Sequence, residues 1–249
     1  MDIGAIGIHL GVLALERLSK ARLVACRVWR PNAELRVSLS ALLRISDGGR
    51  FLLIRNYHRP ELFGPVGGVY KYYDDARVQL DEVSFRPQDV GRGDDMRNDL
   101  RGFLPRRYAP QLIKWYEQRT LRESPEACLL RELREELREV KLVSRVSPPA
   151  ELPLRPVRTV REGPERVPGQ AYTQYRVFEV FDIATNATAA ADAFRRLFEI
   201  AAVGHDHLLI ATSDEIVAGR ARNGRRIGSH TAYLIRRSRV LPPEPPFTS

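Results

Sequence analysis

Apolar and polar positions alternate along the first part of the chain. Residues 35–45 alternate from Leu35 and Val37 onward, which predicts a long strand. Asp47-Gly48-Gly49 is a turn sequence, and the apolar run at 51–54 predicts a second strand, so we expect these two strands to form a hairpin. After a loop over 57–68, apolar positions between 78 and 85 indicate a further strand.

The rest of the chain mixes helical and strand patterns. Residues 86–106 are polar with clusters of Gly and Asp, which favours a loop with short helices. Ser124-Pro125 starts a strong helix, because serine caps helices well and proline suits the first helical position. Helices are expected over 112–116, 124–140, 189–201, from 213, and over 229–235, and strands over 152–161, 171–183 and 208–211. This mixture argues for an α/β or α+β fold.

The helix at 124–140 carries a cluster of carboxylates. Glu132, Glu135 and Glu136 fall within about one third of its circumference, and leucines occupy the far side. Like charges at these spacings repel, so the cluster needs a counter-charge. Arg131 and Arg134 supply it if this is a solvated amphipathic face. If the face is a metal site, the counter-charge comes from a divalent cation such as Mg²⁺ or Mn²⁺, which in turn holds a phosphate.

The spacing over Glu123–Glu136 resembles the core of the Nudix box, with Glu-x7-Arg-Glu-Leu-x-Glu-Glu fully present. Gly64-Pro65-Val66-Gly67-Gly68 resembles the turn that opens the same box. The resemblance covers residues 35–236 and implies a Nudix-like α/β/α sandwich of mixed sheet with flanking helices.

Two departures from the pattern matter. Residues 69–122 separate the glycine turn from Glu123, where the box has five residues. Arg138 stands at the closing glycine of the box, and Glu139 at its aliphatic position. We therefore expect a Nudix-like domain over 31–240 with an insertion at about 75–120 that forms a lid or a binding wall.

The stretch Gly64–Tyr73 narrows the resemblance to the SMODS-associated Nudix domains of bacterial CBASS anti-phage systems. That resemblance implies a sensor or effector domain that binds a cyclic or other nucleotide-derived ligand. The alternative is an active Mg-dependent Nudix hydrolase that cleaves a nucleoside diphosphate-linked substrate, as the intact core from Arg131 to Glu136 permits.

The resemblance also assigns roles. Glu132, Glu135 and Glu136 correspond to the metal-binding and base-supplying glutamates, and Glu123 and Arg131 to a structural ion pair. Gly67 and Gly68 let the backbone approach the metal and phosphate closely. Lys71 and Arg55 are the expected phosphate contacts. Further candidates, each also explained as surface charge or core packing, are Arg59, Arg158, Arg176, Tyr70, Tyr72 and Tyr73. His205 and His207 share one side if they lie in a strand, but lack a third metal ligand nearby in the sequence.

Composition sets the broader limits. The 249 residues are 43% hydrophobic and 29% charged, typical of a soluble globular protein. Cys26 and Cys128 are too few for a disulfide scaffold or a four-cysteine zinc site, so the cytoplasm is expected. The net charge is +9, and all but four of the 40 basic residues are arginines. An anionic partner or a codon habit explains this excess, and no motif indicates sequence-specific nucleic-acid binding.

The two ends differ from the centre. Residues 3–15 are apolar but too short to span a bilayer, where about 20 residues are needed. Within segment 1–30 they form a helix packed on the domain, a membrane- or partner-associating segment, or the remnant of a longer anchor. Residues 241–249 are expected to be a disordered tail. Neither the oligomeric state nor the ligand follows from the sequence. A homo-oligomer is compatible with the sequence.

Overall fold

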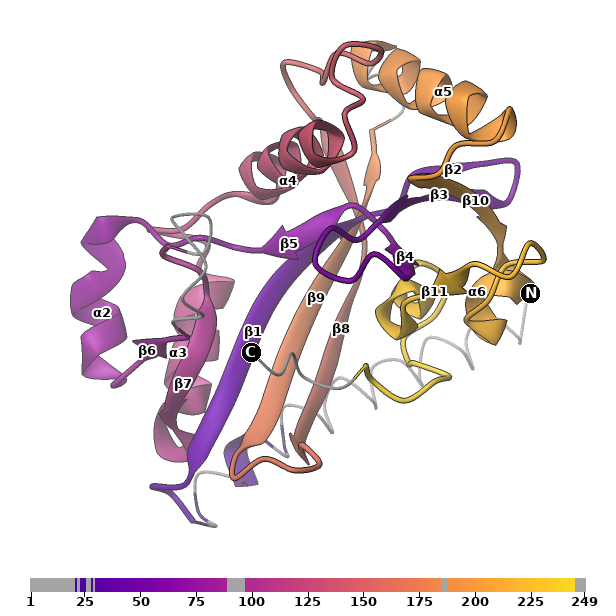
Figure 1. Ribbon diagram of the computed structural model, residues 1–249. Coiled ribbons are helices and arrows are strands. Elements are labelled where there is room, and N and C mark those ends of the chain that lie inside the picture. Colours follow the sequence, from indigo (N-terminus) through magenta and orange to yellow (C-terminus); the bar gives the residue numbers. More distant parts are fainter. Residues whose placement is uncertain are drawn as a thin grey trace, which may run out of the picture. The chain divides into compact units, whose positions relative to one another are not determined.

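The computed structural model describes residues 21, 23–25, 28, 30–88, 97–184 and 188–244 (Figure 1). The chain divides into two compact units. Unit 1 comprises residues 1–40, 69–124 and 160–177, and unit 2 comprises 41–68, 125–159 and 178–249, each within the described residues. The segment 69–124 of unit 1 contains the region where the insertion was expected.

The elements follow one another as a mixture of strands and helices. The strands are β1 (Glu34–Leu43), β2 (Ser46–Asp47), β3 (Arg50–Arg55), β4 (Leu62–Gly64), β5 (Gly67–Val69), β6 (Arg86–Pro87), β7 (Arg101–Pro105), β8 (Leu154–Arg166), β9 (Thr173–Ile183), β10 (Leu208–Thr212) and β11 (Arg226–Ile227). The helices are α2 (Arg77–Glu82), α3 (Ala109–Glu117), α4 (Pro125–Glu139), α5 (Thr188–Ala202) and α6 (Ser213–Ala218), with 3-10 turns η1 (Asp74–Ala76), η3 (Arg106–Tyr108) and η4 (Ser229–Leu234).

The strands form two sheets. One has the order β6-β7-β1-β9-β8, with β5 also paired to β1. The other has the order β10-β3-β4-β11, with β2 paired to β3. In this second sheet β11 runs parallel to β4 and the other pairs are antiparallel. The expectation of a mixed α/β protein with flanking helices is confirmed.

In unit 1, apolar side chains from the strands meet α2 and α3. Leu35, Val37 and Leu104 are fully buried, as are Leu112 and Tyr116 of α3. Arg122 is also buried here. Its guanidinium lies 4.4 Å from the ring centre of Tyr70 and 4.1 Å from that of Tyr116, and it donates to two backbone carbonyls. Tyr70 is therefore part of a core that stacks on an arginine.

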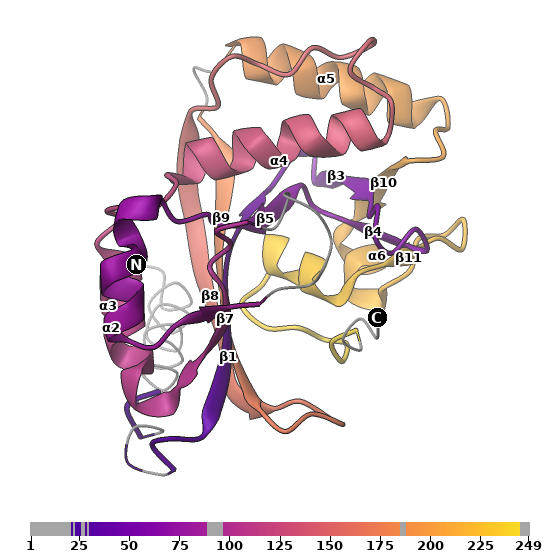
Figure 2. The ribbon, with the colours of Figure 1, turned by 60° about the vertical axis from the view of Figure 1, so that its left-hand side comes forward.

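In unit 2, helices cover both sides of the strands β3 and β10. Helices α4 and α5 lie side by side, and α5 contacts β10 and β3 (Figures 1 and 2). Helix α6 follows β10 on the other side, where Thr212 and Glu215 form a reciprocal capping box. The predicted step from a strand into a helix at Ser213 is confirmed.

Three expectations about elements were wrong. Residues 77–82 form helix α2, because Leu80 and Val83 are buried at helical spacing while Val78 stays 66% exposed. The hairpin partner of β3 is the short β2, whereas the long strand β1 pairs with β5, β7 and β9. The polar stretch expected to be a loop contains β7, which pairs with β1 from Glu34↔Pro105 to Ser38↔Arg101.

The expected apolar segment at 3–15 lies outside the described residues, as do 245–249 of the expected tail. Among the helices that the structure describes, none has both the length and the apolar character needed to cross a membrane.

Candidate functional site

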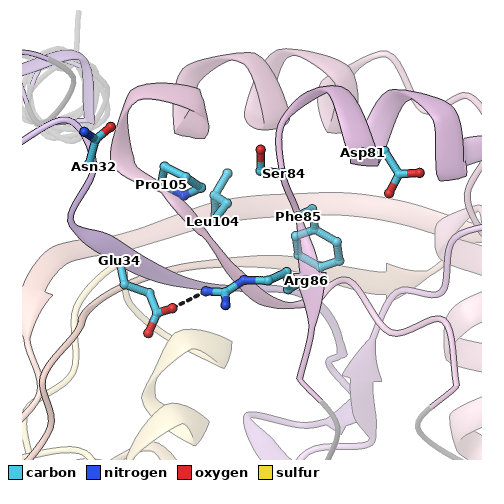
Figure 3. Close-up of a pocket in the computed structure, with 8 residues that line it drawn as sticks. All are labelled: Asn32, Glu34, Asp81, Ser84, Phe85, Arg86, Leu104 and Pro105. Atoms are coloured by element: carbon cyan, nitrogen blue, oxygen red, sulfur yellow. Dashed lines mark hydrogen bonds and ion pairs between the residues drawn. The ribbon is translucent and has the colours of Figure 1, made fainter.

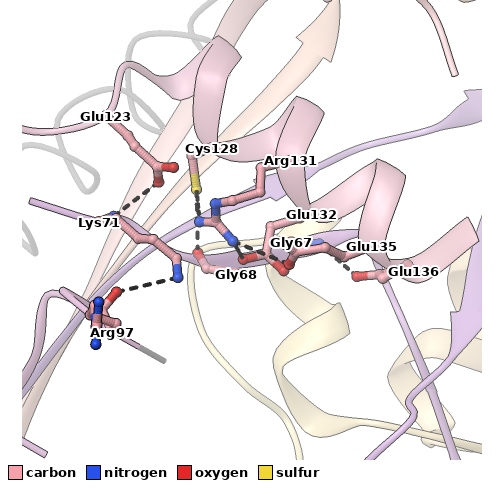
Figure 4. Close-up of polar contacts among 10 residues, drawn as sticks. All are labelled: Gly67, Gly68, Lys71, Arg97, Glu123, Cys128, Arg131, Glu132, Glu135 and Glu136. Atoms are coloured by element: carbon pink, nitrogen blue, oxygen red, sulfur yellow. Dashed lines mark hydrogen bonds and ion pairs between the residues drawn. The ribbon is translucent and has the colours of Figure 1, made fainter. Parts of the chain in front are cut away.

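Helix α4 presents one apolar face and one acidic face, as its sequence predicts. The buried residues of the apolar face are Pro125, Cys128, Leu129, Leu133 and Leu137. The carboxylates of Glu132, Glu135 and Glu136 lie together on a partly exposed face (Figure 4).

Strand β5 brings two glycines against this face. The amide of Gly67 donates a hydrogen bond to Oε1 of Glu136 at 3.2 Å. Gly68 lies so close to Glu132 that a Cβ atom at this position would overlap the Glu132 carboxyl group. The backbone of both glycines therefore lies close to the carboxylates. Its expected approach to a metal and a phosphate stays a prediction.

Arg131 supplies the counter-charge of the cluster. Its Nη1 donates to Oε1 of Glu132 at 2.6 Å and to Oε2 of Glu135 at 3.3 Å. Its Nη2 lies 3.8 Å from Sγ of Cys128, which in turn lies 3.9 Å from the carbonyl oxygen of Gly68 (Figure 4). Arg131 thus pairs with two of the three carboxylates of its own helix, while Arg134 is exposed.

Glu136 has the most strongly perturbed pKa of the cluster. Burial raises its pKa well above the usual value, and the charges of Glu132, Glu139 and Glu135 raise it further. The hydrogen bond from Gly67 acts in the opposite direction. Glu136 therefore holds a proton at pH values where an ordinary glutamate has lost it.

The cluster suits a divalent cation in its chemistry, since Mg²⁺ prefers hard carboxylate oxygens. Across residues that the structure describes, however, no three acidic, histidine or cysteine side chains converge as a metal site. Arg131 is the cation that contacts Glu132 and Glu135. The assignment of Glu132, Glu135 and Glu136 as metal ligands stays a prediction.

Removing this guanidinium is expected to help a metal bind. In Arg131→Gln, Glu132 and Glu135 lose their cation, and we expect Mg²⁺ affinity to rise on the order of tenfold, since two partly exposed ion pairs contribute about 1 kcal/mol each at most. Titration calorimetry with Mg²⁺ measures this. The exposed Arg134→Gln serves as control for the loss of one positive charge on the same helix. Equal Mg²⁺ affinity in Arg131→Gln and Arg134→Gln would argue against competition by Arg131.

Glu123 and Lys71 contact each other within unit 1. The amide of Lys71 donates to Oε2 of Glu123 at 2.9 Å, and the amide of Glu123 donates to the carbonyl oxygen of Lys71 at 2.8 Å. The Lys71 ammonium donates to the carbonyl oxygen of Arg97 at 3.3 Å (Figure 4). Glu123 belongs to unit 1 and Arg131 to unit 2, so their expected ion pair stays a prediction.

The other residues considered for a ligand or metal site lie in different surroundings. Nε of Arg55 donates to the carbonyl oxygen of Pro60 at 2.5 Å, which holds the loop after β3. Tyr70 and Tyr72 are buried, so core packing accounts for them, while Tyr73 is 51% exposed. His205 and His207 precede β10 rather than sharing a strand, and their rings lie 5.7 Å apart.

Sequence reasoning missed an arginine group around Asp182. Arg44 contacts both Asp182 oxygens, at 2.6 and 2.7 Å, and Arg155 contacts one of them at 2.7 Å. Burial lowers the pKa of the nearby Arg158, and the positive charges of Arg44 and Arg237 lower it further. Arg44 and Asp182 are 138 positions apart in the sequence, so no local pattern predicts their contact.

A separate cavity of about 270 Å³ lies in unit 1 (Figure 3). Its lining residues are Asn32, Glu34, Asp81, Ser84, Phe85, Arg86, Leu104 and Pro105. Glu34 and Arg86 form an ion pair with each other at its edge. None of the predicted site residues lines this cavity.

Comparison with known proteins gives one match. A family model described as SMODS-associated NUDIX domain matches residues 34–235, which include β1, both glycines and all of α4. No curated protein and no solved structure matches the chain.

Proposed function

The chain belongs to the SMODS-associated NUDIX domain family, and from this membership we propose that it is a sensor or effector domain that binds a cyclic or other nucleotide-derived ligand in a CBASS-like anti-phage system. Membership of this family implies a Nudix-fold domain in an anti-phage nucleotide-signalling context. The proposal adds the role of the domain and the class of its ligand.

The contact of Arg131 with Glu132 and Glu135 carries the proposal. Two of the three carboxylates that a hydrolase would use for metal are paired with a guanidinium of their own helix. Catalysis through a metal requires that this pairing be broken, whereas recognition of a ligand does not. Arg138, which replaces the closing glycine of the box, is exposed on the same helix.

The arrangement of unit 2 also supports the expected Nudix-like α/β/α sandwich. Helices α5 and α6 lie on opposite sides of the strands β3 and β10. This arrangement fits an α/β/α sandwich of the Nudix type, and the insertion expected at about 75–120 lies in unit 1.

Binding without turnover is the result expected of the proposal. The full chain is mixed with a panel of cyclic di- and trinucleotides and ordinary Nudix substrates, with and without Mg²⁺, and followed by thermal shift. Mass spectrometry then identifies the nucleotide recovered from each sample. A raised melting temperature with intact ligand supports the sensor, and absence of any cyclic-nucleotide binding contradicts it.

The second candidate is an active pyrophosphohydrolase, favoured by the three carboxylates that share one face beside Gly67 and Gly68. If Mg²⁺ binds, Glu132, Glu135 and Glu136 would hold it, and it would supply an activated water for attack on a phosphorus. The residues themselves would position the cation, and Glu136 would hold or release a proton at its carboxyl group. Arg55 of unit 2 is the expected phosphate contact within the same unit, and Lys71, which belongs to unit 1, stays a candidate from the sequence.

Hydrolysis has a specific signature in variants. If the chain is a hydrolase, Glu135→Gln lowers Mg²⁺-dependent turnover about 100-fold or more, the loss typical of a positioned acid–base group. Glu126→Gln is the matched control, because Glu126 is exposed in the first turn of the same helix and lies outside the cluster. Equal turnover in the parent and Glu135→Gln would exclude catalysis by this cluster.

A further inference from the structure

Arg36 of β1 is a largely buried cation held by neutral groups. Its Nε donates to Oε1 of Gln88 at 2.8 Å, and its Nη1 donates to Oε1 of Gln174 at 2.6 Å. Within the described residues, no carboxylate pairs with it. Burial and the positive charges of Arg101 and Arg176 together lower its pKa to about 10. A buried charge without an opposite charge is unfavourable, so this position is suited to an anion.

Arg101 and Arg176 lie on the two strands that flank β1. In the sheet order β7-β1-β9, Ser38 of β1 is opposite Arg101, two positions from Arg36 on the same face. Neighbouring strands are about 4.8 Å apart, so three strands span roughly 10 Å, which is the scale of a few linked phosphates. The opposite face of β1, with Leu35 and Val37, is buried core.

The charges of this arginine cluster are unevenly compensated. Arg176 pairs with Glu162 at 2.7 Å. The Arg101 side chain has no hydrogen bond and no ion pair among the residues that the structure describes. The cluster of Arg36, Arg101 and Arg176 therefore keeps a positive excess even after Glu162 is counted.

An aromatic pair borders the cluster. Phe103 is opposite Arg36 in the β1–β7 register, and its ring contacts that of Tyr172 edge to face, with centres 5.3 Å apart. Both side chains are partly exposed. Aromatic rings beside arginines on a sheet are a surface on which nucleobases stack while the arginines contact phosphate.

We propose that the sheet face of unit 1 formed by Arg36, Arg101 and Arg176, with Phe103 and Tyr172 beside it, binds a nucleotide through its phosphates and base. This site shares no residue with the carboxylate cluster of α4, and its charge is positive where that cluster is acidic. The inference deepens the proposed function and rests on it for the identity of the ligand, because it places recognition of that ligand in unit 1.

The experiment uses the full chain in EDTA, so that no divalent metal contributes. Inorganic tripolyphosphate and then ATP are titrated by calorimetry into the parent, Arg101→Gln and Arg196→Gln. Arg196 is the matched control, because it is exposed on α5 and its loss removes the same charge. We expect Arg101→Gln to weaken tripolyphosphate binding about tenfold, as for one lost charge-assisted contact, and Arg196→Gln to change it less than about twofold.

Two further readouts separate a site from a general charge effect. Without ligand, Arg101→Gln is expected to be at least as stable as the parent, because it relieves repulsion around Arg36. ATP is expected to bind more tightly than tripolyphosphate, and Phe103→Ala to reduce that difference about fivefold or more. Equal weakening in Arg101→Gln and Arg196→Gln, or no binding to the parent, overturns the inference.

Failure of this site and failure of the proposed function are distinguishable. A cyclic nucleotide that binds the parent and Arg101→Gln equally well overturns the site and leaves the sensor proposal standing. Conversely, ATP binding that depends on Arg101, with no cyclic nucleotide bound in the panel, supports the site and contradicts the sensor proposal.

Discussion

Gly67→Ala is expected to destabilise the protein by about 2–3 kcal/mol, whereas Gly68→Ala is expected to cost less than about 1 kcal/mol. A Cβ atom at position 67 would overlap the backbone carbonyl oxygen of Ala41 and lie 2.8 Å from Cδ2 of Leu42. Because the backbone of β1 is fixed by its sheet partners, that overlap forces the strands apart. At position 68 the three atoms nearest to the added Cβ belong to the end of the Glu132 side chain, which can rotate away.

The two alanine variants therefore separate stability from the site. Urea unfolding of both variants measures the free energies. Gly68→Ala, which moves the Glu132 carboxylate, is expected to fold well and to bind Mg²⁺ or a phosphate ligand more weakly. Equal stabilities of the two variants would show that β5 is free to move away from β1.

Glu136→Gln is expected to raise the stability of the metal-free protein at neutral pH. The pKa of Glu136 is raised in the fold, so between the usual carboxyl pKa of 4.5 and the raised value the folded chain holds a proton that the unfolded chain releases. The contribution of Glu136 to the free energy of unfolding is therefore fully present below about pH 4.5 and is lost as pH rises through the raised pKa. A neutral glutamine avoids that loss and still accepts the hydrogen bond from Gly67.

Thermal unfolding of the parent and Glu136→Gln across pH 4 to 8 tests this account. The stability difference is expected to be near zero at pH 4 and to grow in favour of the variant toward pH 8. Mg²⁺ would favour the charged carboxylate, so any stabilisation by Mg²⁺ should increase with pH in the parent and be at least about tenfold weaker in affinity in the variant. A variant that is less stable than the parent at pH 7 would contradict the raised pKa.

The sequence predicted the elements whose patterns are long. Strand β1 and helix α4 each combine a sustained period with clear ends, and both occur where expected. The short elements α2 and β7 were not predicted, because few residues define them. Leu80 and Val83 alone distinguish a helix from alternation, and β7 buries only Gly102 and Leu104, so its period is hardly visible.

The acidic face of α4 was predictable because one helix carries all of it. The counter-charge from Arg131 was one of two alternatives, and its contacts with Glu132 and Glu135 occur in unit 2, while the metal stays a prediction. Contacts between residues far apart in the sequence could not be predicted. Arg36 meets Gln88 and Gln174 at separations of 52 and 138 residues, and only the pairing of β7, β1 and β9 brings them together.

The most direct test of the account measures binding and cleavage in one sample. The full chain is equilibrated with a cyclic dinucleotide or trinucleotide that shifts its melting temperature, in Mg²⁺, with the nucleotide in excess over the protein. Dialysis then gives the bound fraction, and mass spectrometry gives the intact fraction after prolonged incubation. The account predicts saturable binding with the nucleotide recovered unchanged. Mg²⁺-dependent products that accumulate beyond one per protein molecule would contradict it and make the chain a hydrolase.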